Sequence, residues 1–96
     1  MIKIFKTVDE KIAELGFRKV KDDCFMVAYE RDIKFQGKKS YTQSVDICHK
    51  ASGRHIIQSY DMNLFDTDGV GNTCVGLTYK ETKLFLKKMK QKKWIS

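Results

Sequence analysis

A β-hairpin predicted between Ser40 and Tyr60 limits how the rest of this chain can fold. In residues 41–50 the side chains alternate between two faces, and this period of two is typical of a strand with one buried face. Residues 54–60 supply the returning strand, and the three-residue turn between the strands ends on Gly53, which accepts a positive φ. An isolated hairpin is marginal in water, so further strands must extend this one and helices must cover its apolar face.

The three-residue turn also fixes which residues of the two strands face one another. The face expected to be buried collects Val45 and Ile47 from the first strand and Ile57 from the second, and it ends at His49 and His55. The predicted register pairs Lys50 with Arg54, His49 with His55, Cys48 with Ile56, Ile47 with Ile57, and Val45 with Ser59.

The residues before the hairpin predict a helix and two more strands. Apolar residues spaced three or four apart over residues 5–15 indicate an amphipathic helix, with Thr7 as a candidate N-cap and Gly16 as a left-handed end. Residues 18–20 predict a short strand, and the alternation over residues 24–35 predicts the longest strand. The side chains expected on the core face of that longest strand are Phe25, Val27, Tyr29, Ile33 and Phe35.

A second helix is predicted at the end of the chain. Thr78 and Glu81 have the spacing of a capping box, in which each side chain accepts the other residue's backbone N–H. The helix should run to about Lys93, and residues 73–77 before it fit either a last strand or an extended entry. The residues expected to be buried from this helix are Tyr79, Thr82, Phe85, Leu86 and Met89.

These elements predict a single α+β domain over residues 1–96, in which a three- to four-stranded antiparallel meander packs against an N-terminal and a C-terminal helix. No apolar run approaches the roughly 20 residues of a membrane span, so we expect no membrane contact and a cytoplasmic location. Cys24, Cys48 and Cys74 are odd in number and far apart, which favours reduced, mostly buried thiols over a disulfide framework or a zinc knuckle.

Positive charge is concentrated in the last helix. Residues 80–96 contain seven Lys and one acid, a balance of +6, whereas the rest of the chain has twelve bases and eleven acids, a balance of +1. One interpretation is a solvated helix face whose lysines favour the helix dipole. The other is a phosphate-binding surface for nucleic acid. Its candidate residues are Lys80, Lys83, Lys87, Lys88 and Lys90.

Two resemblances accompany this pattern. The Leu15-Gly16-Phe17 helix end, the alternating strands and the Thr78–Glu81 helix start resemble small uncharacterised helix–sheet–helix proteins of low-GC Gram-positive bacteria and their phages, which implies a fold style and no activity. The chain is also similar to the double-stranded RNA-binding domain. That resemblance implies phosphate contacts by Lys80 and Lys83 and a loop role for Gly53-Arg54-His55, although the proline of that loop and the paired lysines are missing.

No motif indicates a catalytic residue or a cofactor, so we expect a small non-enzymatic interaction module rather than an enzyme. Its partner is either another protein or a second copy, and Met26, Tyr41, Ile56 and Tyr60 are candidates for such a surface. Nucleic acid is the alternative partner. A second alternative is metal binding, because His49 and His55 face one another in the predicted register.

Overall fold

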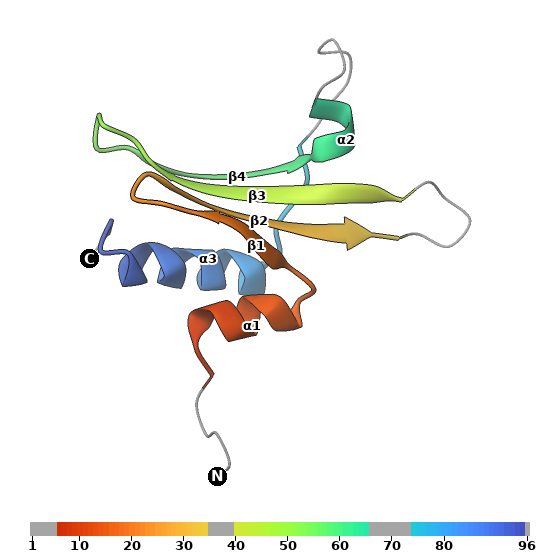
Figure 1. Cartoon of the computed structure of the whole chain (residues 1–96), viewed down its shortest axis with the longest axis horizontal. Helices are drawn as coiled ribbons and strands as arrows, with labels where there is room; N and C mark the ends of the chain where they lie inside the picture. The colour runs from red at the N-terminus through yellow and green to blue at the C-terminus, as the bar shows by residue number, and fades with distance from the viewer. Residues whose placement is uncertain (1–5, 35–39, 66–73, 96) are drawn as a thin grey trace.

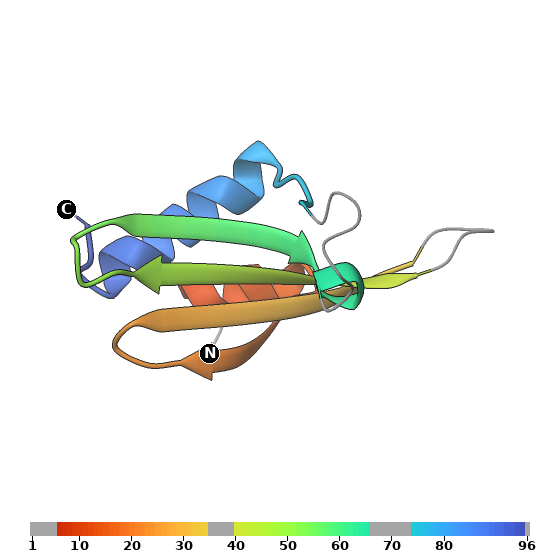
Figure 2. The same ribbon diagram turned by 90° about the horizontal axis from the view of Figure 1, so that it is seen from above.

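The computed structural model describes residues 6–34, 40–65 and 74–95. Its strands are β1 (Arg18–Asp22), β2 (Met26–Ile33), β3 (Tyr41–His49) and β4 (His55–Asp61), and its helices are α1 (Val8–Glu14), α2 (Met62–Phe65) and α3 (Tyr79–Gln91). The strands form one antiparallel sheet in the order β1-β2-β3-β4 (Figure 2). Helices α1 and α3 lie on the same face of this sheet (Figure 1). The predicted α+β meander is therefore confirmed.

The β3-β4 hairpin has the predicted register. His49 pairs with His55, Ile47 with Ile57, and Val45 with Ser59. The turn closes as expected: the Gly53 N–H donates to the Lys50 carbonyl at 2.9 Å, and Gly53 has a φ of 86°. A residue with a Cβ would be strained in this conformation. Turn length and one glycine thus set the alignment of β3 with β4.

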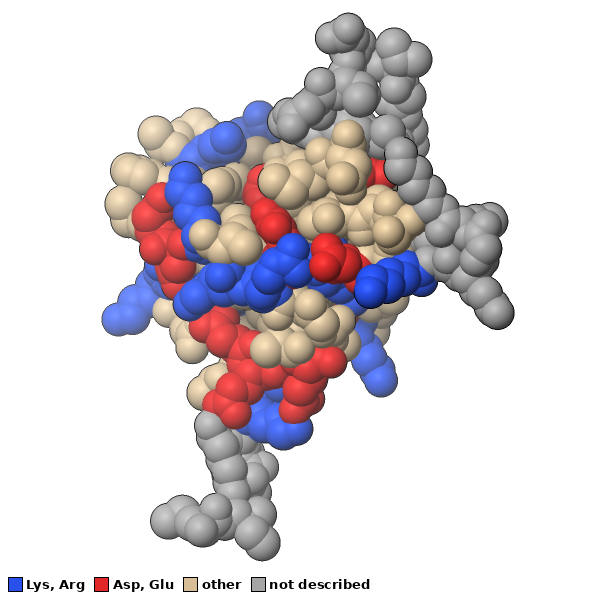
Figure 3. All heavy atoms as spheres, turned by 45° about the vertical axis from the view of Figure 1, so that its right-hand side comes forward, with Lys and Arg blue, Asp and Glu red and all other residues tan. Residues whose placement is uncertain are grey.

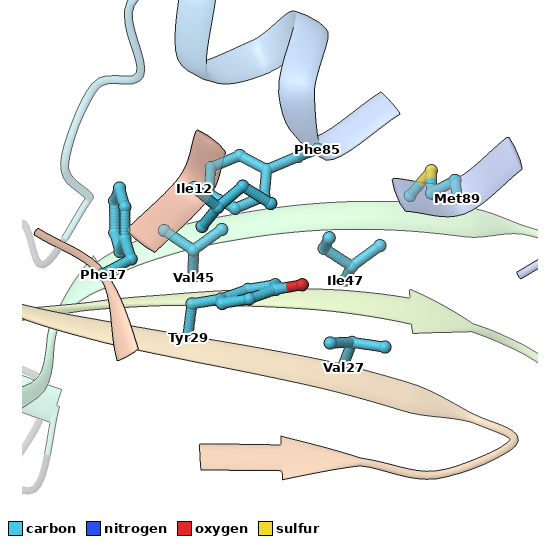
Figure 4. Close-up of a cluster of buried hydrophobic side chains, with 8 residues drawn as sticks. All are labelled: Ile12, Phe17, Val27, Tyr29, Val45, Ile47, Phe85 and Met89. Carbon is cyan, nitrogen blue, oxygen red and sulfur yellow. The ribbon is translucent and has the colours of Figure 1, made fainter. Parts of the chain in front are cut away.

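The core lies between the sheet and the helices α1 and α3. Phe85 of α3 is at its centre, with its ring centroid 5.5 Å from that of Phe17 and 5.6 Å from that of Tyr29. These edge-to-face and tilted aromatic contacts add to the free energy gained by burying the rings. The buried apolar side chains of this cluster are Ile12, Phe17, Val27, Tyr29, Val45, Ile47, Phe85 and Met89 (Figure 4).

Helices α1 and α3 each begin with a capping box at the threonine that the sequence predicts. The Thr7 hydroxyl accepts the Glu10 N–H, and the Thr78 hydroxyl accepts the Glu81 N–H, each at 3.1 Å. Helix α1 is shorter than expected, since it starts only after its Thr7 cap and ends before Gly16. Gly16 has a φ of 96°, and this left-handed residue turns the chain into β1.

The start of β2 corrects one prediction. Phe25 was expected in the core, but its side chain is 63% exposed and β2 begins only at Met26. The Asp23 carboxylate accepts the N–H groups of Phe25 and Met26, each at 2.8 Å, and the Phe25 carbonyl accepts the His49 N–H of β3 at 2.8 Å, so Phe25 lies in the turn that leads into β2. Phe5 and Phe35, which were also expected to face the core, lie outside the described residues.

The segment before α3 is an extended entry rather than a strand. Cys74 makes an isolated bridge with Tyr60, and the Val75 N–H donates to the Ser59 carbonyl at 3.1 Å. The short helix α2 was not predicted.

Burial of the thiols was also predicted wrongly in part, because Cys24 and Cys74 are exposed and Cys48 is half-buried. Within the described ranges, no helix is both long and apolar enough to cross a membrane.

Candidate nucleic-acid interface

A buried polar network orients α3 on the sheet. Arg31 of β2 forms an ion pair with Glu81 of α3, with 2.7 Å between Nη2 and Oε2. The same guanidinium donates to the Gln43 side chain at 2.8 Å and to the Leu15 carbonyl at 3.1 Å, and it lies 4.2 Å from the centre of the Phe17 ring. Because Glu81 must face Arg31, the first turn of α3 has little freedom to rotate.

The side of α3 that faces the sheet differs from the predicted one, so part of the predicted burial was wrong. Tyr79 and Leu86 were expected in the core, but they are 76% and 40% exposed. The buried residues of α3 are Glu81, Phe85, Lys88 and Met89. Phe85 and Met89 were predicted correctly, whereas apolar spacing favoured a stripe displaced to one side of the observed one. The ion pairs of Glu81 with Arg31 and of Lys88 with Asp9 determine which side of α3 is buried. Both partners come from distant parts of the chain.

Asp9 of α1 holds the inner lysine of α3. Lys88 is 5% exposed, and its ammonium lies 3.1 Å from an Asp9 oxygen and 2.9 Å from the Gln91 side-chain oxygen. Asp9 also accepts the Tyr29 hydroxyl at 2.8 Å. Partial burial raises the pKa of Asp9, but the hydrogen bonds from Tyr29 and Lys88 outweigh it, so the pKa lies below its ordinary value. Lys88 is therefore fixed inside the protein and is not presented to a polyanion.

A second carboxylate anchors the end of α3. The Lys92 ammonium lies 2.8 Å from Asp22, next to the turn between β1 and β2. The Lys92 hydrogen bond, followed by that of Lys19, lowers the pKa of Asp22 from 3.8 to about 2. The side of α3 that faces the protein thus has its positive charges matched by acids.

The outer face of α3 is different. Lys80, Lys83, Lys87 and Lys90 are all exposed, and no carboxylate of the described residues lies within 4.0 Å of their ammonium groups. On the side of the molecule seen in Figure 3, by contrast, acidic and basic groups adjoin one another. The structure therefore separates the five candidate lysines into four on an exposed face and one, Lys88, that is buried and paired.

The same exposed face contains a shallow hollow and an aromatic ring. Lys80, Lys83, Leu84 and Lys87 line an open concavity of about 210 Å³. Tyr79 lies beside it, with the Lys83 ammonium 5.2 Å from the centre of the ring. Ligand pockets that enclose a small molecule are usually about 300–1,000 Å³, so this hollow suits a charged group on a larger ligand. Sequence reasoning missed Tyr79 here because capping and apolar spacing accounted for it.

The two features that resemble the double-stranded RNA-binding domain lie at opposite ends of α3. The Trp94 ring stacks on His49 with centroids 5.5 Å apart, which places the hairpin turn beside the end of the helix (Figure 1). Lys80 and Lys83 are at its beginning, and 13 helical residues span about 20 Å. The structure does not bring these lysines together with Gly53-Arg54-His55.

The candidate metal ligands do come together. The Nδ1 atoms of His49 and His55 are 3.1 Å apart, and the rings stack with centroids 4.9 Å apart. One ring can donate to the other when only one of the two nitrogens carries a proton. Zinc sites use three or four protein ligands, and within the described part of the chain no third His, Cys, Asp or Glu joins this pair. The contact with Trp94 gives the pair a structural role at the end of the sheet.

The sheet face opposite the helices is mixed in character. Met26, Ile56 and Tyr60 are half-buried there, but Asp46 lies among them and accepts the Tyr60 hydroxyl at 2.9 Å. Tyr41 belongs to the other face, since it alternates in step with Gln43 and Val45. The candidate surface for self-association is thus not a contiguous apolar patch.

The chain matches no family model, no curated protein and no solved structure.

Proposed function

We propose that this protein is a non-enzymatic binding module that holds nucleic acid through the outer face of α3. The observation that carries the proposal is the sorting of charge between the two sides of that helix. Lys88 and Lys92 face the protein and are paired with Asp9 and Asp22. The outward lysines have no such acid among the described residues, so their charge remains available to phosphates.

The form of the surface supports a backbone-directed mode of binding. Lys80, Lys83 and Lys87 follow one another at intervals of three and four residues, so they lie along one side of the helix. Ammonium groups on flexible side chains act as point charges on phosphates and read no base sequence. Binding should therefore tolerate many sequences and weaken steeply as salt displaces the released counterions.

The proposal is tested by titrating labelled oligonucleotides with the protein and measuring fluorescence anisotropy. If four phosphate contacts form, raising the salt from about 50 to about 200 mM should weaken binding about 50-fold for a single strand and about 150-fold for a duplex. Absence of binding to any nucleic acid at the lower salt concentration would refute the proposal.

A matched pair of variants separates local from overall charge. The test variant is Lys80→Gln, Lys83→Gln, Lys87→Gln and Lys90→Gln combined. The control variant removes four exposed bases elsewhere that have no acidic partner among the described residues, by combining Lys11→Gln, Lys34→Gln, Lys50→Gln and Arg54→Gln. Both lower the net charge equally. We expect the test variant to lose most of its affinity and its salt dependence, and the control to keep most of both. An equal loss in both variants would contradict a site on α3.

A further inference from the structure

We infer that the ligand of this surface is single-stranded nucleic acid, with one base stacked on Tyr79 and the adjoining phosphates held by Lys80, Lys83 and Lys87. The inference rests on the proposed function and adds the class of nucleic acid. It starts from Tyr79, whose side chain is 76% exposed although it is the first residue of a well-capped helix. Thr78 and Glu81 complete the cap by themselves, so neither capping nor burial in the core accounts for an aromatic residue at this position.

The surroundings of Tyr79 match the two requirements of single-strand binding. Such sites combine a positively charged track for the backbone with aromatic rings on which bases stack. Here the ring lies 5.2 Å from the Lys83 ammonium, and Lys83 also lines the concavity with Lys80 and Lys87. A nucleotide whose base covers Tyr79 therefore has its phosphate within reach of the lysines in the hollow.

The next turns of α3 continue the same alternation. Leu86 follows Tyr79 by seven residues, which is two helical turns and about 10 Å further along one line of the helix. Leu86 is 40% exposed, and Lys90 lies one turn beyond it. Apolar and basic side chains thus alternate along the outer face, as expected for a strand that places bases and phosphates in turn on the protein.

A duplex fits this surface less well. Its bases are stacked within the double helix, so a helix face that presents tyrosine and leucine meets only the sugar-phosphate backbone unless it enters a groove and reads base edges. The Tyr79 ring then has no base face on which to stack. An unpaired strand can turn its bases outward, and stacking is tolerant of sequence because every base has a π-face.

The experiment compares a short single strand, its duplex and an abasic phosphodiester strand of equal length. Tyr79→Ala should weaken single-strand binding about 10-fold, whereas Tyr79→Phe should retain it within about twofold. Binding of the abasic strand should be the same for the original protein and Tyr79→Ala. Because the phosphate contacts persist, the salt dependence of Tyr79→Ala should be unchanged. Alanine favours helices, so circular dichroism should show the helix content of the protein unchanged.

Phe25→Ala is the matched control, since Phe25 is a second exposed aromatic residue that lies at the turn before β2. It should leave all affinities unchanged. Equal binding of single strand and duplex, with no effect of Tyr79→Ala, would overturn the inference while the lysine variants still tested the proposed function. Binding to phosphatidylserine vesicles that depends on Tyr79, in place of single-strand binding, would overturn both.

Discussion

Arg31 shows how one partly buried charge can determine the position of a helix. Its side chain is 19% exposed, and its guanidinium connects β2, β3 and the end of α1 to Glu81, whose side chain is 6% exposed. Breaking a buried ion pair is costly because the remaining charge loses its partner in a poorly solvated place. We therefore expect Arg31 to contribute more to stability than Arg18, which is exposed on the edge strand β1.

We expect Arg31→Met to lower the free energy of unfolding by about 3–5 kcal/mol, as measured by urea denaturation. Arg18→Met is the control: Arg18 is 52% exposed and its ion pair with Glu30 is 3.3 Å long, so the loss should be below about 1 kcal/mol. The double variant Arg31→Met/Glu81→Gln should recover part of the stability, because glutamine leaves no charge unpaired and can still cap the helix. Equal losses for the two arginine variants would contradict the assigned role of Arg31.

The junction between α1 and β1 depends on the backbone of Gly16. Gly16 has a φ of 96°, and a Cβ built there would come no closer than 4.0 Å to the Arg31 side chain. Gly16→Ala should therefore destabilise the protein through backbone strain rather than a clash, by about 1–2 kcal/mol. Gly76→Ala is the matched control, since Gly76 has no positive φ and a Cβ there would meet no atom within 4 Å.

Thermal unfolding of both glycine variants tests this expectation. The melting temperature should fall for Gly16→Ala and stay nearly constant for Gly76→Ala, whose change should lie within about 0.5 kcal/mol. A Gly16→Ala protein as stable as the original would show that this helix end can adopt another conformation without cost.

Ion pairs between α3 and the rest of the molecule make its stability depend on pH. Asp9 and Asp22 both have a lowered pKa in the folded protein, and that of Asp22 falls from 3.8 to about 2. A carboxyl whose folded pKa is depressed adds stability above its unfolded pKa, and this stability is lost as the pH falls through the folded value. The free energy of unfolding should therefore decline between about pH 4 and pH 2.

Lys92→Met tests the contribution of Asp22. The variant should be less stable by about 1 kcal/mol at neutral pH, a value reduced by solvent screening because Asp22 is 30% exposed. The difference from the original protein should shrink as the pH falls through about 2, the folded pKa of Asp22, because protonation of Asp22 removes its charge in both proteins. Lys90→Met, which removes an exposed lysine without an acid among its described neighbours, should leave the pH profile unchanged. A pH-independent difference for Lys92→Met would count against the ion pair.

Local patterns in the chain were sufficient to predict the sheet. The alternation in β2 and β3, the turn ending on Gly53 and the two capping boxes each involve residues close in sequence, so short-range geometry determines them. The register from His49 and His55 to Val45 and Ser59 was predicted correctly for that reason. Phe25 was placed wrongly because the turn held by the Asp23 side chain comes directly before β2, and alternation does not show where the turn ends and the strand begins.

The rotation of α3 required contacts between residues far apart in the chain. Apolar spacing favoured a buried stripe with Tyr79 and Leu86, but burial of Glu81 against Arg31 and of Lys88 against Asp9 turns both to the outside. Charged residues are normally assigned to the surface, and a sequence pattern carries no sign of a partner 50 or 79 positions away. The number and location of the lysines were evident from the sequence, whereas the folded chain selected which of them remain exposed and set Tyr79 beside them.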